Sequence, residues 1–179
     1  LLGMLLLLVM TLLAVFASST GIMQERMSGN YRDAARAFEA AENAARWGEF
    51  WIYSLNTPTE RADAMPCEGA GCGSGDIVRK VGTSYPHAME EQDTTWWSNN
   101  TMVYGDDPGT TATEESMRQL EGVAAQPHFA IEHVGFVPDD FGSAGPRTGL
   151  NFYRVTASGV GGQPENRAFT RSTVVYRFE

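Results

Sequence analysis

The first 24 residues of the chain carry no charged side chain, and most of them are Leu, Met, Val, Ala or Phe. An α-helix rises about 1.5 Å per residue, so an uncharged helix of this length spans roughly the hydrocarbon layer of a bilayer. A charged stretch with helical spacing follows directly, starting at Glu25. This junction predicts one long N-terminal helix that is apolar over residues 1–24 and amphipathic over residues 25–56.

The apolar segment differs from a cleavable signal peptide, which opens with a basic region and ends at a small-residue cleavage site. Neither Lys nor Arg precedes the apolar run, and no clear break follows it. We therefore expect a retained membrane helix whose start has been exposed by processing or truncation. Residues 18–21, Ser-Ser-Thr-Gly, are weak helix formers, and we expect the helix to loosen there, close to the edge of the lipid.

Residues 57–179 are enough for one modest head domain. The formal net charge of −9 argues against nucleic-acid binding. Cys67 and Cys72 are the only cysteines and stand close together in a Gly-rich segment. An exported head favours a small disulfide loop between them; two free thiols or a metal site are the alternatives.

The charged half of the predicted helix has one apolar face, with residues recurring at intervals of three and four. This face contains Met23, Met27, Tyr31, Ala34, Ala35, Phe38, Ala41, Ala45 and Ile52. On the polar side, Glu42 and Arg46 form a favourable i,i+4 pair. Residues 56–59, Asn-Thr-Pro-Thr, should end the helix.

The amphipathic half is too charged for lipid, so its apolar face must be covered by another part of the protein or by another molecule. We expect Phe38, Ala41 and Ala45 to hold the helix on the head. The strongest expectation concerns Phe38, whose ring should pack beneath residues of the C-terminal strands. The candidate partners for that ring are Val155, Val174 and Tyr176.

Residues 128–179 read as strands, because apolar and polar residues alternate over 128–136, 150–158 and 168–178. Turn residues at 159–164 join the last two and predict an antiparallel hairpin. One long helix followed by antiparallel strands is an α+β arrangement.

The segment 57–127 is a variable loop region with weak periodicity. Short strands are expected at 76–81 and 94–104, and a short helix at 114–126 that Pro127 stops. If residues 94–104 are extended, Trp96 and Trp97 lie on opposite faces. We expect both rings in the core; the alternative is one ring in the core and the other exposed for binding.

The sequence offers no catalytic, cofactor-binding or metal-binding constellation. The three histidines are His87, His128 and His133; the last two are five apart on one predicted strand and should face opposite sides. No Gly-x-Ser-x-Gly turn occurs, and the Gly-rich segment 69–75 lacks a Walker lysine. Acidic loops at 90–93, 106–107 and 139–140 lack the spacing of an EF-hand. We expect these acids to be solvated loop charges, and a calcium site is the alternative.

Segment 23–45 carries a longer motif, Glu-Arg-Met-x-Gly-Asn-x-Arg-Asp at 25–33 and Ala-Phe-x-Ala-Ala-Glu-x-Ala at 37–44. This segment resembles the helix of PilX-type minor pilins of type IV pili. The Leu-rich start resembles the family's membrane segment, and 153–162 resembles its penultimate strand and turn. A half-apolar, half-amphipathic helix joined to an antiparallel sheet is the pilin plan, so the resemblance implies a pilin-like α+β fold.

The resemblance also implies a structural subunit, without enzymatic activity or cofactor, that helps prime pilus assembly at or near the filament tip. A single helix would hold it in the bacterial inner membrane with its head in the periplasm, before it enters the extracellular pilus. Its partners would be other minor pilins, the major pilin and a PilY-type tip adhesin. The residues that would line the membrane segment and then the filament core include Leu5, Leu8, Leu12 and Phe16.

Most pilins keep a glutamate close to the mature N-terminus, whereas the present chain has no acid before Glu25. The resemblance implies that a subunit lacking this acid can sit at the tip, where no pilin lies above it. Two alternatives remain. A type II secretion pseudopilin of the tip would have a larger head, and a membrane-anchored periplasmic enzyme would need a clustered polar pocket.

Overall fold

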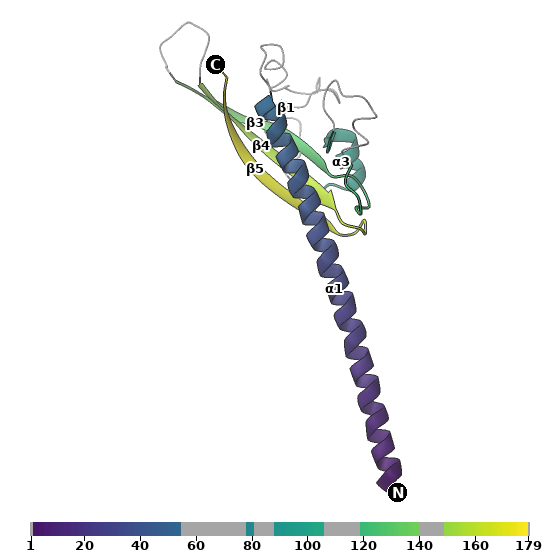
Figure 1. The fold of residues 1–179 in the computed structure, drawn as a ribbon. Helices are drawn as coiled ribbons and strands as arrows, with labels where there is room; N and C mark the ends of the chain where they lie inside the picture. Colours follow the sequence, from purple (N-terminus) through teal and green to yellow (C-terminus); the bar gives the residue numbers. More distant parts are fainter. Residues whose placement is uncertain (1, 55–77, 81–87, 106–118, 140–148, 179) are drawn as a thin grey trace.

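The computed structural model describes residues 2–54, 78–80, 88–105, 119–139 and 149–178. Helix α1, Leu2–Ser54, is continuous and extends far below the head, so that the N-terminus lies at the opposite end of the molecule (Figure 1). The predicted loosening at 18–21 is wrong. The hydroxyl of Thr20 donates to the carbonyl oxygen of Phe16 at 3.0 Å, which satisfies this polar side chain within the helix itself.

The head is built on a five-stranded sheet with the order β1-β3-β4-β5, and β2 also pairs with β3. Its strands are β1 (Val78–Lys80), β2 (Met102–Val103), β3 (His128–Pro138), β4 (Gly149–Val160) and β5 (Arg167–Phe178). The β3–β4 and β4–β5 pairs are antiparallel, whereas β1 runs parallel to β3. The predicted strands in the C-terminal third, the short strand within 76–81 and the final hairpin are therefore confirmed.

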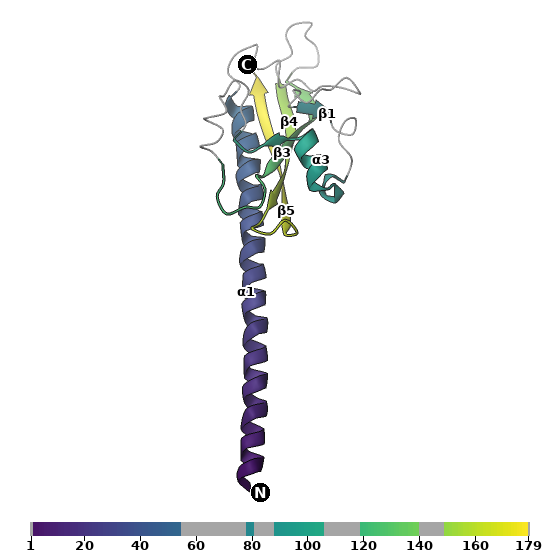
Figure 2. The ribbon, with the colours of Figure 1, turned by 90° about the vertical axis from the view of Figure 1, so that its right-hand side faces the viewer.

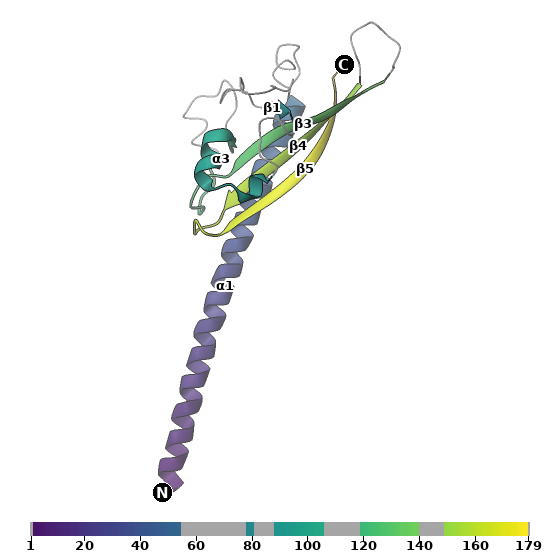
Figure 3. The same cartoon turned by 180° about the vertical axis from the view of Figure 1, so that it is seen from behind.

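The two faces of the sheet are covered by different elements (Figure 2). Helix α1 packs on one face over a core that includes Ile52, Phe129 and Tyr153. The 3-10 helix η2 (Met89–Glu91) and helix α3 (Thr94–Asn100) form a smaller core on the other face. Viewed from behind, α3 lies over the lower part of the sheet, near the start of β3 (Figure 3). The pilin-like α+β arrangement is thus present.

Two expectations for the loop region are wrong. Residues 94–100 form a helix instead of a strand, because the Asp93 carboxylate accepts a hydrogen bond from the Trp96 amide at 2.7 Å and caps the first turn. Trp97 is buried and its indole donates to the Met89 carbonyl at 3.1 Å, whereas Trp96 is half-buried.

Residues 119–126, the described part of the predicted helix 114–126, form turns. The side-chain amide of Gln126 bonds both the amide and the carbonyl of Leu120, at 2.9 and 3.0 Å. These hydrogen bonds satisfy the Leu120 backbone outside a helix.

Candidate functional site

The interface between α1 and the sheet depends on small residues. Gly159 of β4 lies so close to the helix that a Cβ at this position would stand 2.3 Å from the Ala37 carbonyl oxygen and the Ala41 amide nitrogen. Gly48 is similarly tight, because its Cβ would meet a methyl carbon of Val155 at 2.8 Å. The face of α1 that meets the sheet is therefore lined mostly by alanine and glycine, with larger side chains only near the helix end: Ala37, Ala40, Ala41, Ala44, Ala45, Gly48, Trp51 and Ile52.

Phe38 does not pack under the strands as expected. Its side chain is 51% exposed, whereas Ala41 is fully buried. Neighbouring helix residues are separated by about 100° around the axis, so Phe38 points away from the face that Ala37 presents to Gly159. The close approach of the two backbones leaves no room for a phenylalanine ring, and the position of α1 is set by its smallest residues.

A second apolar surface on α1 is left uncovered by the head. We call this surface the apolar stripe and define it as Met23, Met27, Tyr31 and Phe38. Tyr31 is 78% exposed and Met27 is 67% exposed. An exposed apolar strip on a helix that also contacts its own head is typical of a surface that another molecule covers.

Asp33 fastens the helix to the β4–β5 turn. Its carboxylate accepts hydrogen bonds from the Gly162 amide at 2.5 Å, the Asn166 side-chain amide at 2.6 Å and the Gln163 amide at 3.2 Å. The bond from Asn166, supported by those from the two backbone amides and the charge of Arg36, lowers the pKa of Asp33 despite partial burial. The carboxylate is therefore ionised at neutral pH.

A groove runs between α1 and this turn, with a volume of about 660 Å³. We call it the basic groove, because three arginines line it with one acid. Its lining consists of Arg26, Gly29, Asn30, Arg32, Asp33, Arg36, Gly162 and Gln163. Sequence reasoning missed both the groove and Asp33; the available signal was a single acid in line with the buried alanines, four residues before Ala37.

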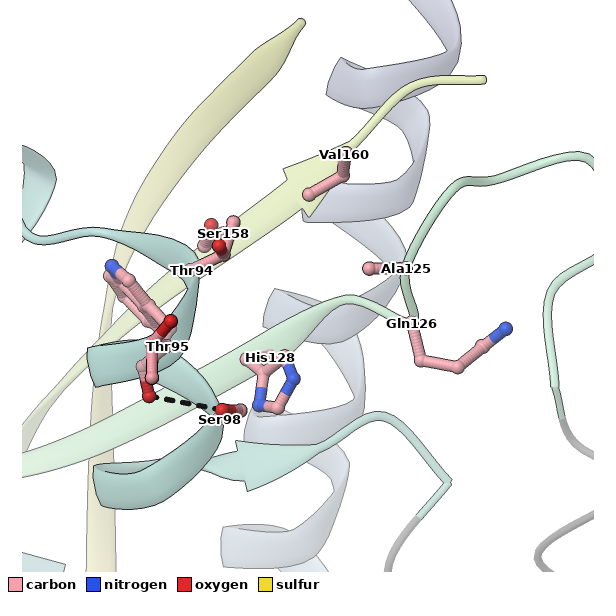
Figure 4. Close-up of a pocket in the computed structure, with 9 residues that line it drawn as sticks. Thr94, Thr95, Ser98, Ala125, Gln126, His128, Ser158 and Val160 are labelled. Carbon is pink, nitrogen blue, oxygen red and sulfur yellow. Dashed lines mark hydrogen bonds between the residues drawn. The ribbon is translucent and has the colours of Figure 1, made fainter. Parts of the chain in front are cut away.

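A smaller pocket of about 260 Å³ lies between α3, the start of β3 and the end of β4 (Figure 4). His128 lines it, and burial, supported by the nearby charge of Arg167, lowers the pKa of this histidine to about 4. Ser98 donates its hydroxyl hydrogen to the Thr95 carbonyl, and Thr101 Oγ1 lies 3.4 Å from His128 Nδ1. These contacts stabilise local structure, and they do not align a serine hydroxyl with the histidine.

His133 lies on the other face of β3, where its ring contacts Tyr153 and its Nε2 lies 3.1 Å from the Asn151 side-chain oxygen. The prediction that His128 and His133 face opposite sides is confirmed. In the part of the chain that the structure describes, no group of three His, Cys, Asp or Glu residues could hold a metal ion.

Acidic residues from two of the loops form ion pairs with strand β5. Asp139 bonds Arg177 at 3.0 Å, and Glu90 bonds Arg171. The predicted Glu42–Arg46 pair is also present, at 2.6 Å. These contacts give Glu90 and Asp139 a structural role.

The predicted membrane or filament-core residues Leu5, Leu8, Leu12 and Phe16 are all exposed on the lower half of α1. By length and composition, α1 can cross a membrane. Cys67, Cys72 and His87 lie outside the described residues, so the disulfide stays a prediction.

Comparison with known proteins gives two matches that together cover nearly the whole chain. Residues 2–46 match the family model "PilX N-terminal", and residues 55–176 match "Type IV pilus assembly protein PilX C-term". The chain belongs to the PilX family of type IV pilus minor pilins. Neither the curated proteins nor the solved structures contain a match to it.

Family membership relates the apolar half of α1, the helix–head contact and the apolar stripe to a role in the pilus. A PilX-family minor pilin is a structural protein of the pilus, and the apolar half of α1 is compatible with both a membrane anchor and a pilus subunit. The N-terminal match includes Asp33 and the buried alanines, which fix the head on the helix. It also includes the apolar stripe, which the head leaves open.

Proposed function

We propose that this PilX-family chain is a non-enzymatic subunit of a minor-pilin complex that primes pilus assembly and sits at or near the filament tip. The observation that carries the proposal is the division of α1 into one face used by its own head and two apolar surfaces that remain open. These open surfaces are the lower half of the helix and the apolar stripe. A subunit that packs against other subunits needs both open surfaces, whereas a membrane-anchored enzyme needs only the apolar lower half of α1.

The lower half of α1 serves two successive environments in this proposal. Leu5, Leu8, Leu12 and Phe16 contact lipid while a single helix holds the subunit in the inner membrane with its head in the periplasm. The same side chains then contact neighbouring helices in the extracellular pilus. Both environments are apolar, so the transfer costs little of the burial energy of these side chains.

The apolar stripe serves the assembled state. Burying a side chain the size of Phe38 contributes roughly 1.5–3 kcal/mol relative to leaving it exposed in water. Neighbouring subunits would gain this contribution at several positions along the stripe. The partners we propose are other minor pilins, the major pilin and a PilY-type tip adhesin.

The two alternatives are less well supported. Both family matches are to PilX models, and PilX is a pilus assembly family. No observation on the described residues favours an enzymatic head; in the pocket at His128, the hydroxyl of Ser98 donates to the Thr95 carbonyl and not to the histidine.

Fractionation of cells tests the proposal. Sheared surface filaments should contain this protein in an amount far below that of the major pilin, and deletion of its gene should reduce the number of filaments. Tip location predicts that an antibody against the head labels filament ends. Protein found only in membranes, or uniform labelling along the filaments, would contradict the proposal.

A further inference from the structure

We propose that the basic groove binds the phosphate of an anionic phospholipid headgroup while the subunit is held in the membrane. This inference rests on the proposed membrane-held state of the subunit and adds a specific ligand to that state. The groove lies beside the contact of Asp33 with the β4–β5 turn, and it shares no residue with the apolar stripe.

The residues that line the groove give it an excess of positive charge, which favours binding of an anion. Arg26, Arg32 and Arg36 contribute three guanidinium groups, and Asp33 is the one acid in the lining. The Asp33 carboxylate already accepts three hydrogen bonds from the β4–β5 turn. Among the described residues, none of the three arginines takes part in an ion pair.

The nearest acids along the helix do not line the groove. Glu25 is adjacent in sequence to Arg26 but is absent from the lining. Glu39 lines a separate hollow, together with Arg36 and the segment around Gly122. The groove itself is therefore positively charged, although the chain as a whole has a net charge of −9.

The groove lies at the level where α1 would leave the lipid. The first charges of the chain, at Glu25 and Arg26, fix this level, because the segment before them is uncharged. The headgroup layer is roughly 5–8 Å thick on each side of a bilayer. Arg32 stands about 9 Å further along the helix than Arg26, and a long arginine side chain can reach back toward the boundary.

The head presents the same region to the membrane. The β4–β5 turn, which contains Gly162 and Gln163, forms the end of the head nearest the apolar half of α1 (Figures 1 and 2). The groove between this turn and α1 is therefore on the underside of the head. A lipid phosphate at the water boundary lies at its entrance.

The chemistry of the lining suits a phosphodiester. Planar guanidinium groups bind phosphate oxygens in pairs, and the side-chain amides of Asn30 and Gln163 can donate further hydrogen bonds. Gly29 leaves space, because nothing lies within 4 Å of the position its Cβ would occupy. Bound lipid would hold the head upright on a membrane that otherwise repels its net negative charge.

The test uses the full chain in neutral detergent micelles, titrated with short-chain phosphatidylglycerol or phosphatidylcholine and read by native mass spectrometry. The groove variant carries Arg26→Gln, Arg32→Gln and Arg36→Gln. A matched control carries Arg46→Gln, Arg171→Gln and Arg177→Gln, which remove the same charge elsewhere. A double variant, Arg26→Gln with Arg32→Gln, keeps Arg36 beside the turn in case the triple variant unfolds.

The proposal predicts saturable binding of phosphatidylglycerol, with affinity weakened roughly fivefold for each groove arginine removed and unchanged in the control. Equal binding of phosphatidylglycerol and phosphatidylcholine would overturn the proposal. An equal loss of phosphatidylglycerol affinity in the groove and control variants would also overturn it. Inorganic phosphate that binds the groove and displaces the lipid at millimolar concentration would identify free phosphate as the ligand and overturn the lipid assignment. Loss of pilus entry in the groove variant without lipid preference would instead indicate a carboxylate of a neighbouring subunit.

The failure of this inference is separable from failure of the proposed function. A wild-type protein that enters sheared filaments but shows no lipid preference would refute only the lipid site. A protein that prefers anionic lipid but never enters filaments would refute only the pilus role.

Discussion

At the scale of single residues, Asp33 joins two parts of the chain that lie far apart in sequence. Its partners in the β4–β5 turn are 129 to 133 residues away. This contact could not be predicted from the sequence. An acid in an amphipathic helix is ordinarily solvated, and no local sequence pattern indicates that a turn distant in sequence lies beside it. Asp33 is the last residue of the motif at 25–33, and in this structure its carboxylate bonds the β4–β5 turn.

The first prediction concerns the charge of Asp33. Asp33→Asn keeps one acceptor oxygen but loses the charge, so the melting temperature of the full chain in detergent should fall by a few degrees at pH 7. Because the pKa of Asp33 in the folded protein is lowered below its ordinary value of 3.8, the stabilisation is present above pH 3.8 and is lost as the pH falls through the folded pKa. The gap between wild type and variant should therefore narrow in acid. A gap that stays constant from pH 7 to pH 3 would show that the charge is irrelevant.

The second prediction concerns His128, whose folded pKa of about 4 lies below its ordinary value of 6.5. Such a group binds its proton better in the unfolded chain, so its contribution to stability is full above pH 6.5 and declines as pH falls toward 4. The loss should approach about 3 kcal/mol at pH 4. Denaturant unfolding of wild type and His128→Gln at several pH values measures it. The variant should show a flatter pH profile, and identical profiles would contradict the assignment.

At the scale of elements, alternation predicted the three long strands because each has one face covered by α1. The face of α1 that docks on the sheet is the one that allows close contact between backbones. Phe38 was expected in this interface because of its large ring, and that expectation is wrong. Helix α3 was missed because its two tryptophans favour a strand, whereas the Asp93 cap decides for a helix. The sequence pattern therefore predicted which segments are strands with one buried face. It did not predict the close approach of the two backbones or the helix cap at Asp93.

The third prediction compares two substitutions at the helix–head interface. Gly159→Ala places a Cβ against the backbone of α1 and should destabilise the head by about 1–3 kcal/mol. Phe38→Ala removes an exposed ring and should change stability by no more than about 0.5 kcal/mol. Thermal melting of the full chain in detergent measures both. A reversed order of the two effects would mean that the ring, and not the glycine, fixes the helix.

The fourth prediction concerns the apolar half of α1. Leu12→Asp puts a charge in a segment whose surroundings are apolar in either state, at a cost of roughly 2.5–3.5 kcal/mol on insertion scales. Membrane fractionation should show reduced insertion, and Leu12→Ala should insert normally as the matched control. Full insertion and wild-type piliation with Leu12→Asp would place this residue in a polar environment.

At the scale of the whole molecule, successive segments of α1 present different surfaces along its length. Residues 1–24 carry no charge, residues 26–36 contribute to the basic groove, and the residues that hold the head from Ala37 onward are mostly alanine and glycine. The part of α1 that carries the head lies at the end of the helix far from the N-terminus (Figure 1). The head contacts α1 from Asp33 to the end of the helix. The apolar half of α1 and the apolar stripe are left open by the head and are available for membrane and neighbouring subunits.

The most direct test of this account measures entry into the pilus when the apolar stripe alone is changed. A strain lacking the native gene should express Tyr31→Asp with Phe38→Asp, or Val175→Asp as a control on an exposed apolar residue of the sheet. Immunoblots of sheared filaments and membranes then give the ratio of assembled to stored protein. The account predicts that the stripe variant stays in the membrane with unaltered head melting, while the control enters filaments like wild type. A stripe variant that enters filaments at the wild-type ratio would contradict it.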